Sequence, residues 1–287
     1  MTVLVSGATG TTGTEVLRQL RAAGAPVRAL TRHEAAAQRL LKAGIDVVVA
    51  DLTDPDSLPA ALDGIKAVYL ATSASPELPQ LESNLATCAA QAGVGHLVKL
   101  SVIGASANST ITFSRLHDAA EQAIRRSGMP WTMVRPNGFM QNTLAWSAQV
   151  ADGAIRGPVI DARWSIVDVR DVAAVAFAAL LDPEAHAGET YTVTGPEATS
   201  PREQVEILAE VLGRPLLAQE VSIDQAKQGM LAGGWRAWSA ERMGELFGFY
   251  ADGLGETISP DVQRVTGARA RDYRTFATDH AESFGAA

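Results

Sequence analysis

Cysteine is almost missing from this sequence: Cys88 is the single cysteine among 287 residues. One thiol excludes a disulfide framework and a cysteine-based metal site. The five histidines show no metal-ligand spacing, so we expect no bound metal. The sequence also lacks a Gly-x-Ser-x-Gly elbow, which argues against a hydrolase with a serine triad.

An excess of positive charge and a long apolar run are missing as well. With 24 Lys and Arg against 32 Asp and Glu, the formal net charge is −8, which argues against a nucleic-acid or anionic-membrane surface. The longest apolar run, residues 172–181, is too short to cross a bilayer, and no signal peptide pattern precedes the first apolar stretch. We therefore expect a cytoplasmic protein without a nucleic-acid or membrane partner, and a homodimer is left open.

A glycine-rich turn lies near the beginning of the chain. An apolar stretch at residues 3–5 runs into Ser6-Gly7-Ala8-Thr9-Gly10-Thr11-Thr12-Gly13, and apolar residues at helical spacing follow. Glycine lets the backbone approach a ligand closely, and the free N–H groups and dipole of a helix start favour an anion. The spacing differs from the G-x-G-x-x-G fingerprint, and the absence of a following Gly-Lys-Ser/Thr excludes a P-loop. We predict a pyrophosphate site at Gly7, Thr9, Gly10, Thr11, Thr12 and Gly13, with an ordinary strand–helix turn as the alternative.

The end of the second expected strand, residues 27–30, indicates which dinucleotide is bound. An acidic residue about 20 positions beyond the glycines would bind the ribose hydroxyls of NAD. Here Thr31 and Arg32 occupy that place, and a guanidinium can pair with a 2′-phosphate. NADP(H) is therefore the preferred cofactor, although Glu34 lies near enough to keep NAD(H) open. The alternative is that Arg32 ends a strand in solvent.

Strands and helices alternate regularly up to residue 135. Further strands are expected at 45–50 (buried), 66–71, 96–101 and 131–135, with a helix at 111–126 before the last of them. This alternation predicts an α/β fold, a Rossmann-type doubly wound parallel sheet whose ligand lies at the carboxyl ends of the strands. The residues at those ends, which we expect to contact the cofactor, are Asp51, Leu52, Ala71, Thr72, Ser73 and Ser101. Asp51 could accept a hydrogen bond from adenine or cap the helix that begins near Pro55.

The pattern loosens after residue 138. We expect a helix at 139–151, a short strand at 158–160, a helix at 168–181, a strand at 190–194 and mostly helices from 201 onward. This divides the chain into an NAD(P)-binding Rossmann domain at 1–155, against which 164–194 packs back, and a smaller, mostly helical substrate-binding lobe at 156–287. Five aromatic residues gather in that lobe, where core packing is the favoured interpretation over a substrate cage: Trp235, Trp238, Phe247, Phe249 and Tyr250.

Two further segments stand out beside the glycine turn at 7–13 and Arg32. They are Arg135-Pro136-Asn137-Gly138-Phe139-Met140-Gln141-Asn142 and Ser165-Ile166-Val167-Asp168-Val169-Arg170-Asp171-Val172. Together these four features resemble the NmrA-like family of atypical short-chain dehydrogenases/reductases. The resemblance implies NAD(P) binding in a Rossmann domain, with Pro136, Asn137, Gly138 and Phe139 among the cofactor contacts. Such proteins include quinone reductases, other NADPH-dependent reductases, and regulators that bind the dinucleotide without turning it over.

The usual Tyr-x-x-x-Lys pair of that superfamily is missing, because none of the four tyrosines has Lys four residues later. The expected helix carries His117 and Glu121 instead, one turn apart on the same face. His117 is the candidate catalytic residue, since its ordinary pKa lies near working pH, and Glu121 could hold its tautomer. The alternatives are that His117 binds cofactor ribose or packs in the core, and that Glu121 is a solvated neighbour on the helix. We therefore expect an NADP(H)-dependent oxidoreductase acting on a small, largely apolar quinone or carbonyl compound, or else a dinucleotide-sensing regulator that acts through a protein partner.

Overall fold

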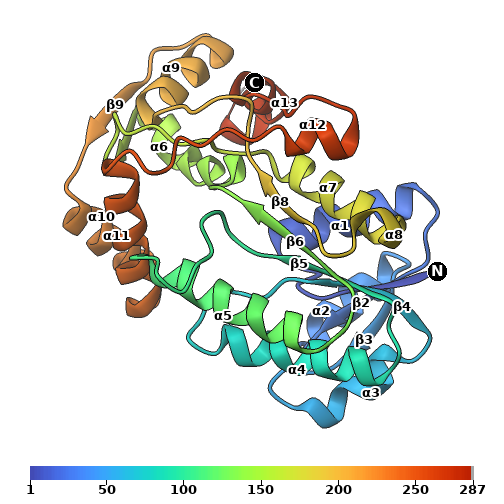
Figure 1. The fold of residues 1–287 in the computed structure, drawn as a ribbon. Helices are drawn as coiled ribbons and strands as arrows, with labels where there is room; N and C mark the ends of the chain where they lie inside the picture. Colours follow the sequence, from blue (N-terminus) through green and yellow to red (C-terminus); the bar gives the residue numbers. More distant parts are fainter. Residues whose placement is uncertain (286–287) are drawn as a thin grey trace. The chain divides into compact units, whose positions relative to one another are not determined.

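A seven-stranded sheet runs through the computed structural model, which describes residues 1–285 (Figure 1). The strand order is β3-β2-β1-β4-β5-β6-β8, and the pairs from β3 through β6 are parallel. The strands are β1 (Thr2–Val5), β2 (Val27–Thr31), β3 (Asp46–Val49), β4 (Ile65–Leu70), β5 (His96–Leu100), β6 (Trp131–Pro136) and β8 (Thr190–Val193). The strand order reverses between β1 and β4, which confirms the predicted doubly wound fold.

Helices follow the strands and cover both faces of the sheet, with α4 and α5 on one face and α1 and α7 on the other (Figure 1). These helices are α1 (Thr11–Ala22), α2 (Glu34–Lys42), α3 (Leu58–Leu62), α4 (Leu78–Gln91), α5 (Thr112–Arg126), α7 (Val169–Leu181) and α8 (Pro183–His186). Helix α1 shows why they pack so, because its residues Val16, Leu17 and Leu20 share one stripe and are all buried. Within residues 1–285, no helix combines the length and the apolar character needed to cross a bilayer.

Strand β3 corrects one expectation. The sequence predicted a buried strand at 45–50, but β3 is the edge strand of the sheet, and its residues Asp46 and Val49 are exposed. Only its flanking residues Ile45 and Ala50 are buried. A run of β-branched residues predicts a strand correctly, but it does not reveal that a second neighbouring strand is missing.

The segment after Gly138 departs from two expectations. In place of one helix at 139–151, a 3-10 helix (Met140–Trp146) leads into a short α6 (Ser147–Ala151). The strand expected at 158–160 is wrong: the strand in this region is β7 (Ala154–Gly157), which pairs with β9 (Leu217–Glu220). Residues 158–160 form a turn, because Pro158 lacks an N–H donor and Val159 adopts a left-handed φ of 48°.

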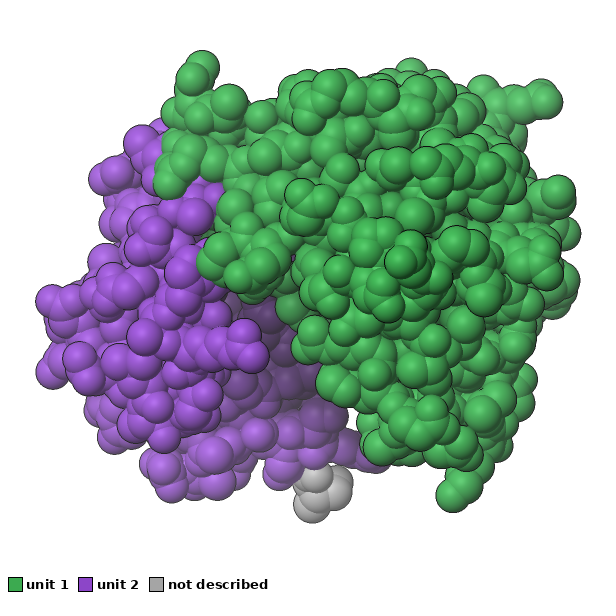
Figure 2. All heavy atoms as spheres, turned by 90° about the horizontal axis from the view of Figure 1, so that it is seen from below, with its two compact units in different colours: residues 1–109, 113–135, 172–192 green, residues 110–112, 136–171, 193–287 purple. Residues whose placement is uncertain are grey.

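The chain divides into two compact units (Figure 2). The first holds residues 1–109, 113–135 and 172–192, and the second holds 110–112, 136–171 and the chain from 193 onward. The second unit contains the remaining helices, α9 (Pro201–Leu212), α10 (Ile223–Ala232), α11 (Ala237–Ala251), α12 (Asp261–Thr266) and α13 (Tyr273–Asp279). Because these units are drawn from several stretches each, the division at residue 155 remains a proposal about domain organisation.

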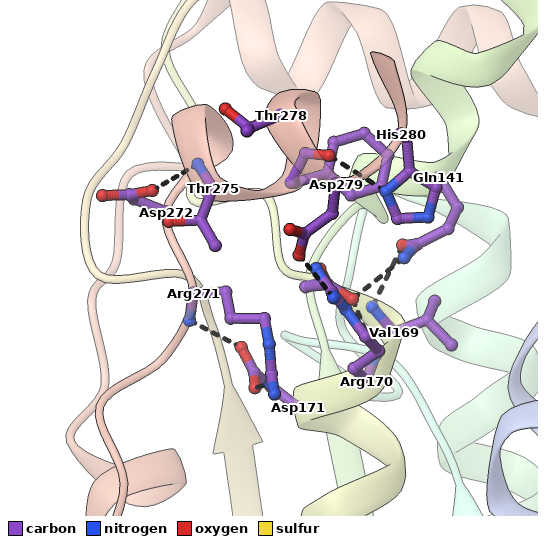
Figure 3. A network of polar contacts seen from close by, with 12 residues as sticks. Gln141, Val169, Arg170, Asp171, Arg271, Asp272, Thr275, Thr278, Asp279 and His280 are labelled. Carbon is purple, nitrogen blue, oxygen red and sulfur yellow. Dashed lines mark hydrogen bonds and ion pairs between the residues drawn. The ribbon is translucent and has the colours of Figure 1, made fainter. Parts of the chain in front are cut away.

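Ion pairs in the second unit tie its C-terminal segment to the start of α7 (Figure 3). Arg170 bonds both Asp168 and Asp279, and the backbone N–H of Arg271 donates to Asp171 at 2.7 Å. Burial alone would raise the pKa of Asp168, but hydrogen bonds from Arg170 and Gln141 hold that pKa below 3.8. The Asp-Val-Arg-Asp motif therefore holds the tertiary structure of this unit together.

His96, at the start of β5, is buried in a neutral state. Its Nε2 lies 3.0 Å from the hydroxyl of Thr132, and that hydroxyl donates to the carbonyl of His186 at 2.6 Å. The hydroxyl therefore accepts from His96, whose proton must be on Nε2. Burial, and to a smaller extent the charge of His186, lower the pKa of His96 to about 4.

This arrangement predicts how stability depends on pH. Since the unfolded state binds a proton near pH 6.5 and the folded state only near pH 4, the contribution of His96 is complete above pH 6.5. It is lost as the pH falls from 6.5 to 4, by about 3 kcal/mol for a shift of this size. Urea unfolding at several pH values should show a steeper acid loss for the parent than for His96→Asn. Parallel curves for the two proteins would rule out this contribution.

Candidate functional site: a helix start and a buried polar row in the first unit

Two of the three glycines in the turn are required by the backbone itself. Gly7 has a left-handed φ of +61°, and a Cβ there would lie 2.8 Å from the carbonyl oxygen of Ala71. A Cβ on Gly13 would lie 2.1 Å from the carbonyl oxygen of Gly7. Both contacts are with backbone atoms that cannot move away cheaply, so Gly7 and Gly13 shape the turn.

Gly10 is different, because it is exposed and open. A Cβ there would meet one atom, the carbonyl oxygen of Gly7, at 3.2 Å. Gly10 is also the N-cap of α1, and it provides no side-chain cap for the first helical N–H groups. By contrast, Ser200 and Ser222 cap α9 and α10 through complete capping boxes. The start of α1 thus keeps its amides and dipole free for an anion, as a pyrophosphate site requires.

The threonines of the turn fall into two groups. Thr9 and Thr11 are exposed beside the open helix start, where their hydroxyls can reach a phosphate. Thr12 is 5% exposed, so its backbone N–H rather than its hydroxyl is the group that a ligand could meet. Hydroxyl donation to a phosphate therefore fits Thr9 and Thr11 better than Thr12.

The ends of β2 and β3 bring Arg32 close to Asp51. Arg32 is exposed, and its Nε donates to the ring of His33 at 3.1 Å. The carboxylate of Asp51 accepts from the N–H of Thr53, and this bond, supported by the charges of Arg32 and His33, lowers the pKa of Asp51. Asp54 caps the short helix that begins at Pro55, so the capping alternative for Asp51 is wrong. Leu52 is half-buried next to it.

Three predicted cofactor contacts follow the end of β4: two of these residues are hydrogen-bonded within the protein, and the third is exposed. Both backbone groups of Ala71 bond the hydroxyl of Ser6, which holds Ala71 against Gly7. Thr72 donates its hydroxyl proton to Glu82 at 2.8 Å, so toward a ligand this oxygen acts as an acceptor. Ser73 is exposed.

A buried ion pair that the sequence analysis missed lies behind these residues. The ammonium of Lys99 on β5 contacts the carboxylate of Glu82 on α4, and both side chains are fully buried. Burial raises the pKa of Glu82, and the charge of Lys99 opposes that rise. The signal was present in the sequence as a lysine inside an apolar strand and a glutamate on the apolar face of a helix.

His117 belongs to this pair rather than to Glu121. Its Nδ1 lies 3.2 Å from the Lys99 ammonium, while the ring as a whole is 8% exposed. Burial, and then the charge of Lys99, hold the pKa of His117 well below 6.5. The expectation that His117 titrates near working pH is therefore wrong, because it was based on the ordinary pKa of an exposed histidine.

Glu121 forms a separate cluster with Arg135 on β6. Arg135 binds its carboxylate through two bonds of 2.8 and 2.6 Å, Arg125 adds a third at 2.9 Å, and Ser101 donates its hydroxyl at 2.6 Å. These donors hold the pKa of Glu121 below 4.5 even though burial, the largest influence, acts to raise it. The suggestion that Glu121 sets the tautomer of His117 is wrong, and the hydroxyl proton of Ser101 is committed to Glu121.

The residues Pro136, Asn137, Gly138 and Phe139 fall in the second unit. There the Asn137 amide donates to Ser165 and Gly255 and accepts from Tyr250 and from the N–H of Gly138, which uses all its usual bonds. The Asn137 side chain therefore supports the second unit, and a cofactor contact of these four residues stays a prediction.

Of the five aromatic residues expected to pack in the core, Tyr250 does so. Its ring is buried and stacks on Trp164 with centroids 4.4 Å apart, as core packing requires. Trp235 is 49% exposed and is no core residue, while Trp238, Phe247 and Phe249 are partly buried.

A glycine turn joins the carboxyl end of β1 to a helix without a side-chain cap, in a sheet of order β3-β2-β1-β4-β5-β6-β8. These features define a dinucleotide-binding α/β protein. The NmrA-like family model matches residues 1–277, and the chain belongs to the NmrA-like family.

Three similar proteins have names that describe reductases. An NAD(P)H azoreductase of Xenophilus azovorans is 38% identical over 99% of this chain and 100% of that protein. A (4-alkanoyl-5-oxo-2,5-dihydrofuran-3-yl)methyl phosphate reductase of Streptomyces griseus is 41% identical, over 98% of this chain and 99% of its own length. The crystal structure of a Citrobacter triphenylmethane reductase complexed with NADP(H) has a TM-score of 0.85, with 25% identity over 98% of this chain and 100% of that one.

Proposed function

We propose that the chain is an NADP(H)-dependent oxidoreductase that reduces a small, largely apolar quinone or carbonyl compound. The observation that carries this proposal is the start of α1 at Gly10, which has no side-chain cap and no side chain in front of the first helical N–H groups. In the same unit, Arg32 and Thr72 follow the carboxyl ends of β2 and β4, and His117 of α5 contacts Lys99 of β5. The reductase names of the two relatives near 40% identity support the class of reaction.

The residues of the chain bind and orient rather than provide a strong acid. When bound, NADP(H) supplies the hydride. The backbone N–H groups of Thr11 and Thr12 would hold its pyrophosphate, and Arg32 its 2′-phosphate. No tyrosine of the chain has Lys four residues later, and His117 is held neutral, so neither supplies the usual acid. Reduction of a conjugated acceptor suits such a site, because hydride addition gives a delocalised product anion that can take a proton from water.

The relatives' names point to conjugated acceptors rather than simple ketones. The substrates in these names are an azo compound, an unsaturated furanone phosphate and triphenylmethane compounds. Trp238 and Phe249 lie on one face of α11 and are partly buried, so they offer apolar surface suited to such molecules. A small-molecule substrate of this class is therefore the favoured one, and a homodimer stays a separate proposal.

Steady-state consumption of NADPH tests the proposal against the regulator alternative. The panel should contain a naphthoquinone, an azo dye, an unsaturated lactone and a simple aldehyde, with turnover of at least one conjugated acceptor expected. Tight NADPH binding without turnover of any acceptor would favour a dinucleotide-sensing regulator that acts through a protein partner.

The preference for NADP(H) over NAD(H) should depend on Arg32. A charge-assisted contact with the 2′-phosphate contributes about 1.5–3 kcal/mol, so Arg32→Ala should remove most of the preference for NADPH. Calorimetric affinities for NADPH and NADH, measured for the parent and the variant, check this. Arg126→Ala, an exposed arginine at the end of α5, is the matched control and should leave both affinities unchanged. Equal affinities of the parent for the two cofactors would refute the assignment.

A further inference from the structure

The Lys99 ammonium is buried with three acceptors around it. They are the carboxylate of Glu82, the carbonyl oxygen of Leu100 at 3.2 Å and Nδ1 of His117 at 3.2 Å. An ammonium has three N–H donors and no lone pair, so each contact uses one donor. His117 must accept at Nδ1, and a neutral imidazole that accepts at one nitrogen carries its proton on the other.

The charges around His117 come from three elements besides its own helix. Lys99 of β5 touches the ring, and Glu82 of α4 lies behind Lys99 and also accepts from Thr72. On α5 itself, Glu121 is bonded to Arg125 of α5 and to Arg135 of β6. The nearest positive charge therefore faces Nδ1, while the negative charges are bonded to other partners.

We infer that Lys99, anchored by Glu82, is a positioning residue that keeps His117 in the neutral Nε2–H tautomer, so that His117 offers a hydrogen-bond donor to an acceptor atom of the substrate. This rests on the proposed reductase function. The donated hydrogen bond stabilises negative charge that develops on a substrate oxygen or nitrogen, and the proton stays on Nε2. The rate should then be independent of His117 ionisation around neutral pH.

The tautomer can be measured directly in the unmodified protein. With ¹⁵N-labelled histidine, two-bond proton–nitrogen spectra distinguish a bare ring nitrogen from a protonated one, and His117→Asn assigns the signals. At pH 7 the parent should show a bare Nδ1 and a protonated Nε2, and it should keep this pattern well below pH 6.5. A protonated Nδ1, or an imidazolium at pH 7, would overturn the inference.

A paired substitution then tests whether Lys99 is the cause. Lys99→Met combined with Glu82→Leu removes both buried charges at similar volume, which proteins tolerate better than removal of one partner. Without the ammonium, the pKa of His117 should rise, the tautomers should mix, and kcat should gain a dependence on pH. Lys66→Met, an exposed lysine on β4, is the control and should leave spectra and kcat unchanged.

The outcomes separate this inference from the proposed function. A tautomer and titration in the double variant identical to those of the parent would overturn the role of Lys99. If the spectra behave as expected but no acceptor is reduced, the positioning of His117 stands and the reductase proposal fails. A changed pH profile of kcat together with unchanged NADPH affinity supports both.

Discussion

Gly10→Val should abolish binding of NADP(H) while the protein remains folded. Gly10 is exposed, and a Cβ there meets only the Gly7 carbonyl at 3.2 Å, so the turn needs to shift by only a few tenths of an ångström to keep its fold. The branched side chain would instead occupy the open space before the first amides of α1, where a pyrophosphate must lie. Thermal unfolding with and without NADPH measures this, since a ligand at 100 times its Kd stabilises a protein by about 2.7 kcal/mol.

Two further glycines serve as controls for this experiment. Gly13→Ala should destabilise the protein even without ligand, because its Cβ would lie 2.1 Å from the Gly7 carbonyl oxygen. Gly229→Ala, in α10, has no atom within 4 Å of the added Cβ and should keep the full NADPH shift. An undiminished shift in Gly10→Val would mean that the glycine turn is merely structural.

Glu121→Ala should be among the most destabilising single substitutions in the first unit. The carboxylate is fully buried and accepts from Arg135, Arg125 and Ser101. Breaking a buried pair from one side costs about 3–5 kcal/mol, and the partial exposure of both arginines places this case near 3. Urea denaturation at pH 7 measures the loss.

The exposed pair Glu210–Arg274 provides the comparison for Glu121. Both side chains are more than half exposed, so Glu210→Ala should change the free energy of unfolding by less than about 1 kcal/mol. If Glu121 served chiefly to orient His117, its replacement would lower kcat and leave stability near that of Glu210→Ala. The contacts with Arg135 predict the opposite result.

Much of the first unit could be predicted because its signals are local. The alternation of apolar strands with helices between residues 2 and 135 shows in periods of 2 and 3.6, and the doubly wound sheet follows from it. The helix start at Gly10 could be located from three glycines in that context. The prediction of a strand at 158–160 was wrong because the local signal there was ambiguous. A short apolar stretch after proline does not distinguish a turn from a strand.

The partners of the buried charges could not be predicted in this way. His117 and Glu121 stand one helical turn apart, and that spacing suggested a pair. In the structure, Lys99 reaches one and Arg135 the other, from strands 18 and 14 residues away. The helical period shows which residues share a face of the helix, but the hydrogen-bond partners of that face come from neighbouring strands.

By itself, then, the sequence determined the class of fold and the position of the glycine turn, because both depend on residues close together in the chain. The selection of a 2′-phosphate by Arg32 stays a prediction. Only the tertiary structure decided that Gly10 is the open glycine, and that His117 is neutral beside Lys99 and Glu82. The physical reason is that burial and the distance between charges set a side chain's protonation and hydrogen bonds, and both arise when segments distant in sequence pack together.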